Sequence, residues 1–94
     1  MRKSGLRRIF IMKNNIEKLR KEVDVLDGRL VLLLNKRNTL VKEIMKIKSE
    51  NNLNIKDKSR ERYIIDRLMR ISNDKKLVMD IYKIIFDHSV KGCR

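Results

Sequence analysis

An arginine occupies a position of an apolar helical stripe, and this makes it the first candidate for chemistry. Arg37 stands among residues that recur at alternating spacings of four and three, which place one stripe along a long helix that packs against other helices. A guanidinium keeps its proton, so burying it without a partner is costly. Arg37 therefore either extends its head to water along its aliphatic stem or meets an anion inside the helical packing. The stripe consists of Leu19, Val23, Leu26, Leu30, Leu33, Arg37, Leu40, Ile44 and Ile47.

Two further cations could serve the same site. Lys48 follows Arg37 by eleven residues, about three helical turns, so both side chains face one side of the helix. Arg20 precedes Arg37 by seventeen residues, roughly 25 Å along the axis, which is too far for one shared site within a chain. In an antiparallel homodimer whose long helices cross near Gly28, Arg20 of one chain can lie beside Arg37 of the other. The alternative for Arg20 and Lys48 is that both are ordinary solvated charges.

Acidic and hydroxyl groups supply the remaining candidates. Asp57, Arg60 and Glu61 stand at i, i+3 and i+4, so one helical turn presents all three on a common face. Ser89 and Cys93 are likewise i, i+4 neighbours near the end of the chain. Each also has an ordinary structural interpretation: a helix cap for Asp57, surface ions for Arg60 and Glu61, a hydroxyl bonded to its own helix for Ser89, and an unimportant terminal residue for Cys93.

The elements that must position these residues are three helices, one long and two shorter, in an all-α fold. The first is expected over about 15–49, weakened only at Gly28, and a polar, Asn-rich loop follows over 50–56. Asp57 is expected to cap a second helix over about 58–72. Ser72, Asn73 and Asp74 break this helix, and a third helix runs over about 75–91 until Gly92 ends it.

The start of the chain has a different character. Residues 1–11 carry four basic residues and are not expected to share the stripe that begins at Leu19. We predict that 1–11 form a disordered basic extension and that 12–94 form the helical domain.

Composition narrows the partners and the compartment. The 94 residues make one small domain, and 25 Lys and Arg against 12 Asp and Glu give a net charge of +13. This charge favours an anionic partner, whether nucleic acid, a membrane surface or a small dianion. The single Cys excludes an internal disulfide, and the longest apolar run, 30–34, is far too short to span a membrane. No export signal is recognisable, so we expect a cytoplasmic protein.

Helix lengths predict an assembly. A helix of about 35 residues is about 50 Å long, and the two later helices reach about half of that. They cannot cover the whole stripe, and soluble monomers avoid such exposed apolar surfaces. Pairing of two first helices in an intertwined homodimer removes the problem.

The order of these residues resembles the all-helical class of chorismate mutases over Ile16 to Cys93. The resemblance rests on the run Leu19-Arg20, Leu26-Asp27, Arg37, Lys48, then Asp57-Lys58-Ser59-Arg60-Glu61-Arg62, and finally Ser89. It implies an intertwined dimer of three-helix protomers with two sites, each completed by an arginine from the partner's first helix. It also implies the rearrangement of chorismate to prephenate, a step of the shikimate pathway in aromatic amino acid biosynthesis, without a metal or a cofactor.

The resemblance further implies a role for each candidate. Arg37 and the partner's Arg20 would hold the carboxylates of the dianionic substrate, and Lys48 would bind a carboxylate and the ether oxygen. Asp57 and Glu61 would take the ring hydroxyl with Arg60 adjacent, and Ser89 would bond to the ring carboxylate. Catalysis would come from holding the compact, reactive conformer and from stabilising negative charge on the breaking ether oxygen.

One position departs from the family, and two alternatives remain. Cys93 stands where the family usually carries a Gln or Glu that donates to the ether oxygen, and a thiol is a weaker donor. The first alternative is an isochorismate pyruvate-lyase of the same fold, whose site is very similar. The second is a basic helical protein that binds nucleic acid without enzyme activity, although the chain lacks an aromatic platform for single strands.

Overall fold

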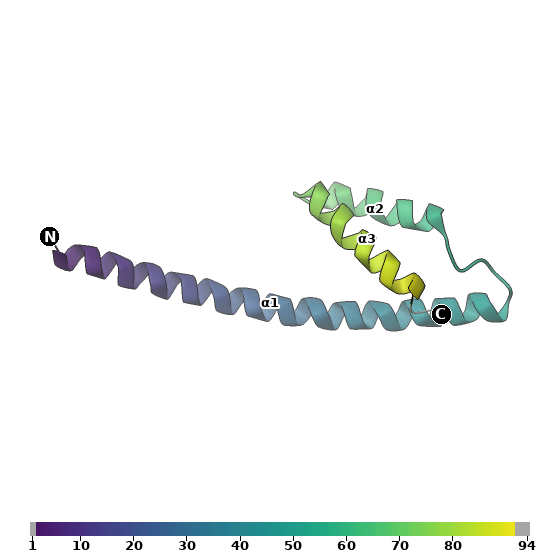
Figure 1. Cartoon of the computed structure of the whole chain (residues 1–94), viewed down its shortest axis with the longest axis horizontal. Coiled ribbons are helices and arrows are strands. Elements are labelled where there is room, and N and C mark those ends of the chain that lie inside the picture. The colour runs from purple at the N-terminus through teal and green to yellow at the C-terminus, as the bar shows by residue number, and fades with distance from the viewer. Residues whose placement is uncertain (1, 92–94) are drawn as a thin grey trace. The chain divides into compact units, whose positions relative to one another are not determined.

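Three helices make up the regular structure of residues 2–91, the part of the chain that the computed structural model describes (Figure 1). They are α1 (Arg2–Glu50), α2 (Lys58–Ile71) and α3 (Lys75–Lys91). Side chains are described for residues 5–89. The prediction of an all-α chain with one long and two shorter helices is confirmed for these residues, which contain no strand.

The start of α1 differs from the prediction. The helix begins at Arg2 rather than near residue 15, so most of the segment for which we expected disorder is helical. The sequence contains the physical reason: Ile9, Met12 and Ile16 continue, toward the N-terminus, the alternation of three and four residues that we traced only from Leu19. Ile9 therefore falls on the apolar stripe, although residues 1–11 were not expected to share it. The division into an extension and a domain at residue 12 stays a prediction.

The loop that follows α1 closes the end of that helix. Asn52 adopts a left-handed backbone with φ 56°, a conformation that asparagine tolerates better than most residues. The Leu53 amide can then donate to the Lys48 carbonyl at 2.7 Å, and the Asn51 side chain donates to the Ile47 carbonyl at 2.8 Å. The asparagines of the predicted loop thus satisfy carbonyls that a helix end leaves without partners.

Two aspartates begin the shorter helices. Asp57 caps α2 as predicted, because its carboxylate accepts a hydrogen bond from the Arg60 amide at 2.9 Å. Asp74 does the same for α3 by accepting from the Leu77 amide at 3.0 Å. The predicted break between these helices is also confirmed, and the Ser72 hydroxyl accepts from the Asp74 amide at 2.9 Å. The predicted end of the third helix at Gly92 lies outside the described residues.

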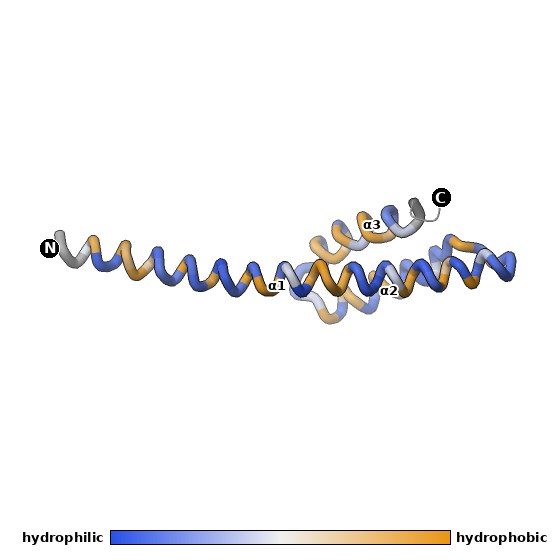
Figure 2. Tube along the Cα trace, turned by 90° about the horizontal axis from the view of Figure 1, so that it is seen from below, coloured by the Kyte–Doolittle hydropathy of each residue, from blue (hydrophilic) through white to orange (hydrophobic). Residues whose placement is uncertain are grey.

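The chain divides into two compact units, residues 1–36 and 37–94. In the first, the described residues are the greater part of α1, where hydrophobic and hydrophilic residues alternate along the helix (Figure 2) and the stripe side chains are mostly exposed. The second contains the end of α1 together with α2 and α3, which pack against each other. Ile64 of α2 is the one buried apolar side chain among those described. None of the described helices is apolar over a stretch long enough to cross a membrane.

Candidate active site

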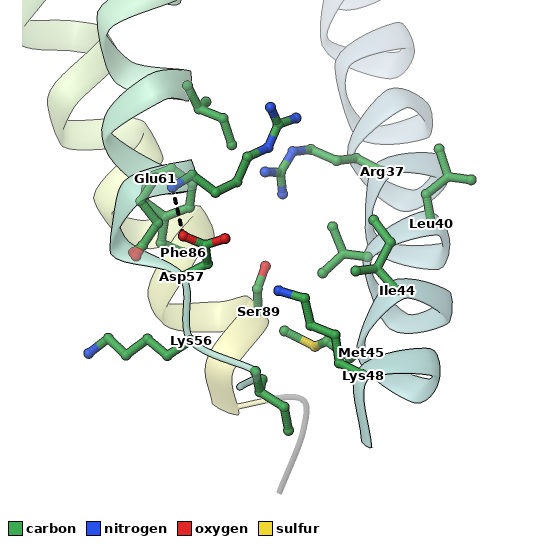
Figure 3. A pocket seen from close by; sticks show the side chains of 14 residues that line it. Arg37, Leu40, Ile44, Met45, Lys48, Lys56, Asp57, Glu61, Phe86 and Ser89 are labelled. Atoms are coloured by element: carbon green, nitrogen blue, oxygen red, sulfur yellow. Dashed lines mark hydrogen bonds between the residues drawn. The ribbon is translucent and has the colours of Figure 1, made fainter. Parts of the chain in front are cut away.

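A cavity of about 260 Å³ in the second unit is lined by residues from the end of α1, the start of α2 and the end of α3 (Figure 3). It is smaller than the typical pocket for a drug-sized ligand, so it suits a small organic molecule. Six predicted site residues line it, namely Arg37, Lys48, Asp57, Arg60, Glu61 and Ser89. The other lining residues are Leu40, Val41, Ile44, Met45, Ile55, Lys56, Ile64 and Phe86.

The two cations of α1 enter the cavity from one side. Arg37 and Lys48 are both half-buried, and both point from α1 into the space toward the other two helices (Figure 3). The prediction that a spacing of eleven residues puts them on the same side is confirmed. The Lys48 ammonium points toward the Ser89 hydroxyl of α3.

The guanidinium of Arg37 contacts an aromatic ring but lacks one hydrogen-bond partner. Its Nη1 atom is buried and has no hydrogen-bond partner. Among the described residues, it is the one buried side-chain nitrogen or oxygen without a partner. Its Cζ atom lies 5.8 Å from the centroid of the Tyr82 ring, within the range of a cation–π contact. Tyr82 in turn meets the edge of Phe86, with ring centroids 5.7 Å apart and planes at 62°. Leaving a charged donor buried and unpaired is costly, so this nitrogen favours an anionic ligand.

The first turn of α2 presents a cation and two carboxylates. One Asp57 oxygen is occupied by the capping bond from the Arg60 amide, drawn as a dashed line in Figure 3, which leaves the second oxygen for a ligand. The Arg60 guanidinium carbon lies 5.1 Å from the centroid of the Tyr63 ring on the same helix. Glu61 is half-buried at the cavity wall. The structural interpretation of Asp57 as a cap is thus confirmed, and the residue also lines the cavity.

On α3, Ser89 has a local partner. Its hydroxyl donates to the Ile85 carbonyl at 2.9 Å, so the ordinary interpretation of a hydroxyl bonded to its own helix is confirmed. In this arrangement the hydroxyl can still accept a bond from a neighbouring cation, and it must rotate before it can donate to a ligand.

The charge balance of the cavity favours an anion. Four cations, Arg37, Lys48, Lys56 and Arg60, line it together with two carboxylates, Asp57 and Glu61, so the lining residues carry a net charge of +2. Of these cations, Lys56 points away from the space (Figure 3). The exposed N-terminal turn of α2 adds further positive potential. Such a site can bind carboxylates through charge-assisted hydrogen bonds and fix their direction.

Two predicted site residues are not placed around the cavity. Arg20 belongs to the unit of residues 1–36 and is exposed, and Cys93 lies outside the described residues. Sequence reasoning in turn missed Tyr82 and Phe86. A usable signal was present, because Tyr82, Phe86 and Ser89 stand at i, i+4 and i+7 and so share one face of the third helix. Among the described side chains, no three His, Cys, Asp or Glu residues gather where they could hold a metal ion.

Comparisons with known proteins agree on one family. The model of the family chorismate mutase type II matches residues 19–92. A chorismate mutase of Methanocaldococcus jannaschii is 29% identical over 82 residues, which cover 83% of each chain. Two bifunctional chorismate mutase/prephenate dehydratases also match, from Aquifex aeolicus at 41% identity over 59 residues and from Buchnera aphidicola at 30% over 82. These matches cover 63% and 83% of this chain but only 16% and 21% of the longer proteins. No solved structure matches the chain.

Proposed function

The chain belongs to the chorismate mutase type II family, and from this premise we propose that the cavity around Arg37 is where chorismate is bound and rearranged. The chain is an isomerase that converts chorismate to prephenate, a step of aromatic amino acid biosynthesis. The observation that carries the assignment to this cavity is the buried Nη1 atom of Arg37, which lacks a partner within the described residues. A carboxylate of the substrate would supply that partner.

The rearrangement is intramolecular, so the work of the site is to select a conformation and to stabilise charge. The substrate must be held in a compact conformer in which the atoms that bond lie close together, and fixing two carboxylates achieves this. Negative charge grows on the ether oxygen as its bond to carbon breaks. Lys48 points into the cavity from the same side as Arg37, which suits it to stabilise this charge.

The remaining lining residues complete the proposed binding mode. The free oxygen of Asp57 and the carboxylate of Glu61 would accept from the ring hydroxyl, with Arg60 balancing their charge. Ser89 would bind the ring carboxylate after its hydroxyl turns from the Ile85 carbonyl. Cys93 would take the position of the donor to the ether oxygen, a role that stays a prediction, as does the cytoplasmic location.

We further propose an intertwined homodimer in which Arg20 of each chain completes the site of the other. One observation supports it. The stripe residues of α1 are exposed on both sides of Arg37, as they are at Leu33 and Leu40, so a second helix is needed to cover them.

The two alternatives are not favoured, because the matching family and the M. jannaschii relative are chorismate mutases. The deciding experiment incubates the purified protein separately with chorismate and with isochorismate. Loss of chorismate with formation of prephenate supports the proposal. Release of pyruvate from isochorismate with chorismate left unchanged would show a lyase instead, and no turnover of either compound by a folded helical protein would refute the enzyme assignment for this chain.

A further inference from the structure

The apolar seam of α1 is symmetric about residue 28. In the observed helix it has twelve positions from Ile9 to Ile47, and the spacings of three and four residues read the same from either end. Two antiparallel copies of this helix would therefore place every seam position opposite another seam position. The facing positions are Ile9 with Ile47, Met12 with Ile44, Ile16 with Leu40, Leu19 with Arg37, Val23 with Leu33, and Leu26 with Leu30.

The N-terminal residues are needed for this symmetry. Without Ile9, Met12 and Ile16 the seam would begin at Leu19, and its C-terminal positions would face no apolar residue in this register. Within one chain, these three side chains are 50%, 53% and 45% exposed. The positions that they would face are exposed to a similar degree, with 53% for Leu40, 53% for Ile44 and 57% for Ile47. Each set leaves an apolar strip of the kind that the other set could cover.

We propose that residues 9–18, which precede the family match at residue 19, are part of the dimer interface and pack on residues 40–47 of a second copy. This inference rests on the dimer proposed above and gives it a register. Leu40 and Ile44 also line the cavity, so the N-terminal segment of the second copy would form part of the wall around the bound substrate. The segment that looked like an appendage would thus contribute to the site.

Charges beside the seam support the same occupant. In an antiparallel pair the residues on one flank of the seam face those on the same flank of the other chain. In this register Arg8 faces Glu50, and Glu22 faces Lys36, so each opposite-charge pair occurs twice per dimer. At the centre, Arg29 faces its own copy on this flank and Asp27 faces its own copy on the other, so each flank has one like-charge pair. The outer pairs therefore favour a second copy of this chain in the antiparallel orientation.

Thiol cross-linking tests the register directly. Cys93→Ser removes the native cysteine, and this parent receives either Met12→Cys with Ile44→Cys or Val23→Cys with Leu33→Cys. Within one helix the paired residues are about 48 Å and 15 Å apart, so a disulfide can form only between chains. We expect most of each oxidised double variant to migrate as a covalent dimer. The parent carrying Met12→Cys alone should remain monomeric on the same gel, because parallel helices would be needed to join the two copies of residue 12.

The outcomes separate this inference from the proposals it rests on. Cross-linking of Val23→Cys/Leu33→Cys without Met12→Cys/Ile44→Cys would overturn the role of the N-terminal segment and leave the dimer intact. Cross-linking of Met12→Cys alone would overturn the antiparallel register, and failure of both pairs would overturn the inference together with the dimer. Chorismate turnover by the unmodified protein, measured in parallel, reports the proposed function independently of all three results.

A second measurement uses the same residue without cysteines. Met12→Asp should raise the dimer dissociation constant at least tenfold in sedimentation equilibrium, because it places a charge at an apolar seam position. The matched control is Asn14→Asp, which introduces the same residue on the opposite side of the helix and should leave the constant within a factor of two. Equal effects of the two variants would contradict the proposed packing.

Discussion

Replacing Arg37 with leucine should change activity and stability in opposite directions. The variant loses the guanidinium that we propose binds a substrate carboxylate, and it gains an apolar side chain at a seam position. A bidentate arginine–carboxylate contact contains two hydrogen bonds to charged groups, each contributing about 1.5–3 kcal/mol. Losing both amounts to about 3–6 kcal/mol, which corresponds to a fall in kcat/KM of roughly 10²- to 10⁴-fold.

The expected gain in stability follows from the same buried atom. Nη1 of Arg37 is buried without a partner, so leucine removes an unsatisfied charged donor and places an apolar group between other apolar seam residues. Replacing buried ion pairs with well-packed apolar side chains is often neutral or stabilises a fold by about 1–4 kcal/mol, and the Arg37 Nη1 atom lacks even the partner that such a pair provides. At the lower end of that range, the Tm of a domain of this size rises by about 4–8 °C.

The assay combines steady-state kinetics on chorismate with thermal unfolding followed by circular dichroism. Lys46→Leu is the matched control, because it removes an exposed cation from the other side of α1 and should change neither quantity strongly. An Arg37→Leu protein that is folded and retains its kcat/KM would refute the binding role. A Tm lowered by several degrees would show instead that the guanidinium stabilises the fold, and the interpretation of Nη1 as a site for an anion would then be wrong.

Four further experiments test the site and the helix that carries it. Mixing inactive Arg20→Ala and Arg37→Ala subunits should restore one competent site per heterodimer, which recovery of activity after subunit exchange would reveal. Tyr82→Leu should raise KM for chorismate several-fold by releasing the Arg37 guanidinium, whereas Tyr82→Phe, which keeps the ring, should not. Gly28→Ala should raise stability by about 0.5–1 kcal/mol in denaturant unfolding, because an added Cβ meets no atom within 4 Å and alanine favours the helix. Cys93→Gln should raise kcat more than it changes KM, and unchanged steady-state kinetics would place the donor elsewhere.

Much of the fold could be predicted from local chemistry. The aspartate at residue 57 and the polar break at 72–74 mark helix ends because their side chains compete with the backbone for hydrogen bonds, and such effects act within a few residues. The start of α1 was missed for a different reason. The basic residues before Met12 suggested a separate segment, whereas the spacing of Ile9, Met12 and Ile16 shows that the seam continues through it.

The sequence could predict which residues form the candidate site better than it could predict their contacts. Arg37 and Lys48 could be placed on one side of a helix because their spacing fixes their azimuth. Spacing alone could not decide whether the Arg37 head reaches water or stays buried, since that depends on Tyr82, which comes from another helix. The sequence allowed Ser89 to bond to its own helix but could not establish it. The bond to the Ile85 carbonyl competes with bonds to a ligand that the sequence does not contain.

The short connection between α1 and α2 should tolerate changes in its residues better than changes in its length. Residues 51–57 are all exposed, and exposed loops usually accept insertions and deletions readily. Here, one end of the loop fastens the last turn of α1, through the bond from Leu53 to the Lys48 carbonyl, while the other end supplies the cap at Asp57. Both ends carry cavity residues, so the loop acts as a spacer whose length sets how far apart two binding groups stand. A single inserted residue would displace one group relative to the other without disturbing any core, and natural variation in this segment should therefore be found in residue type while the residue count stays constant.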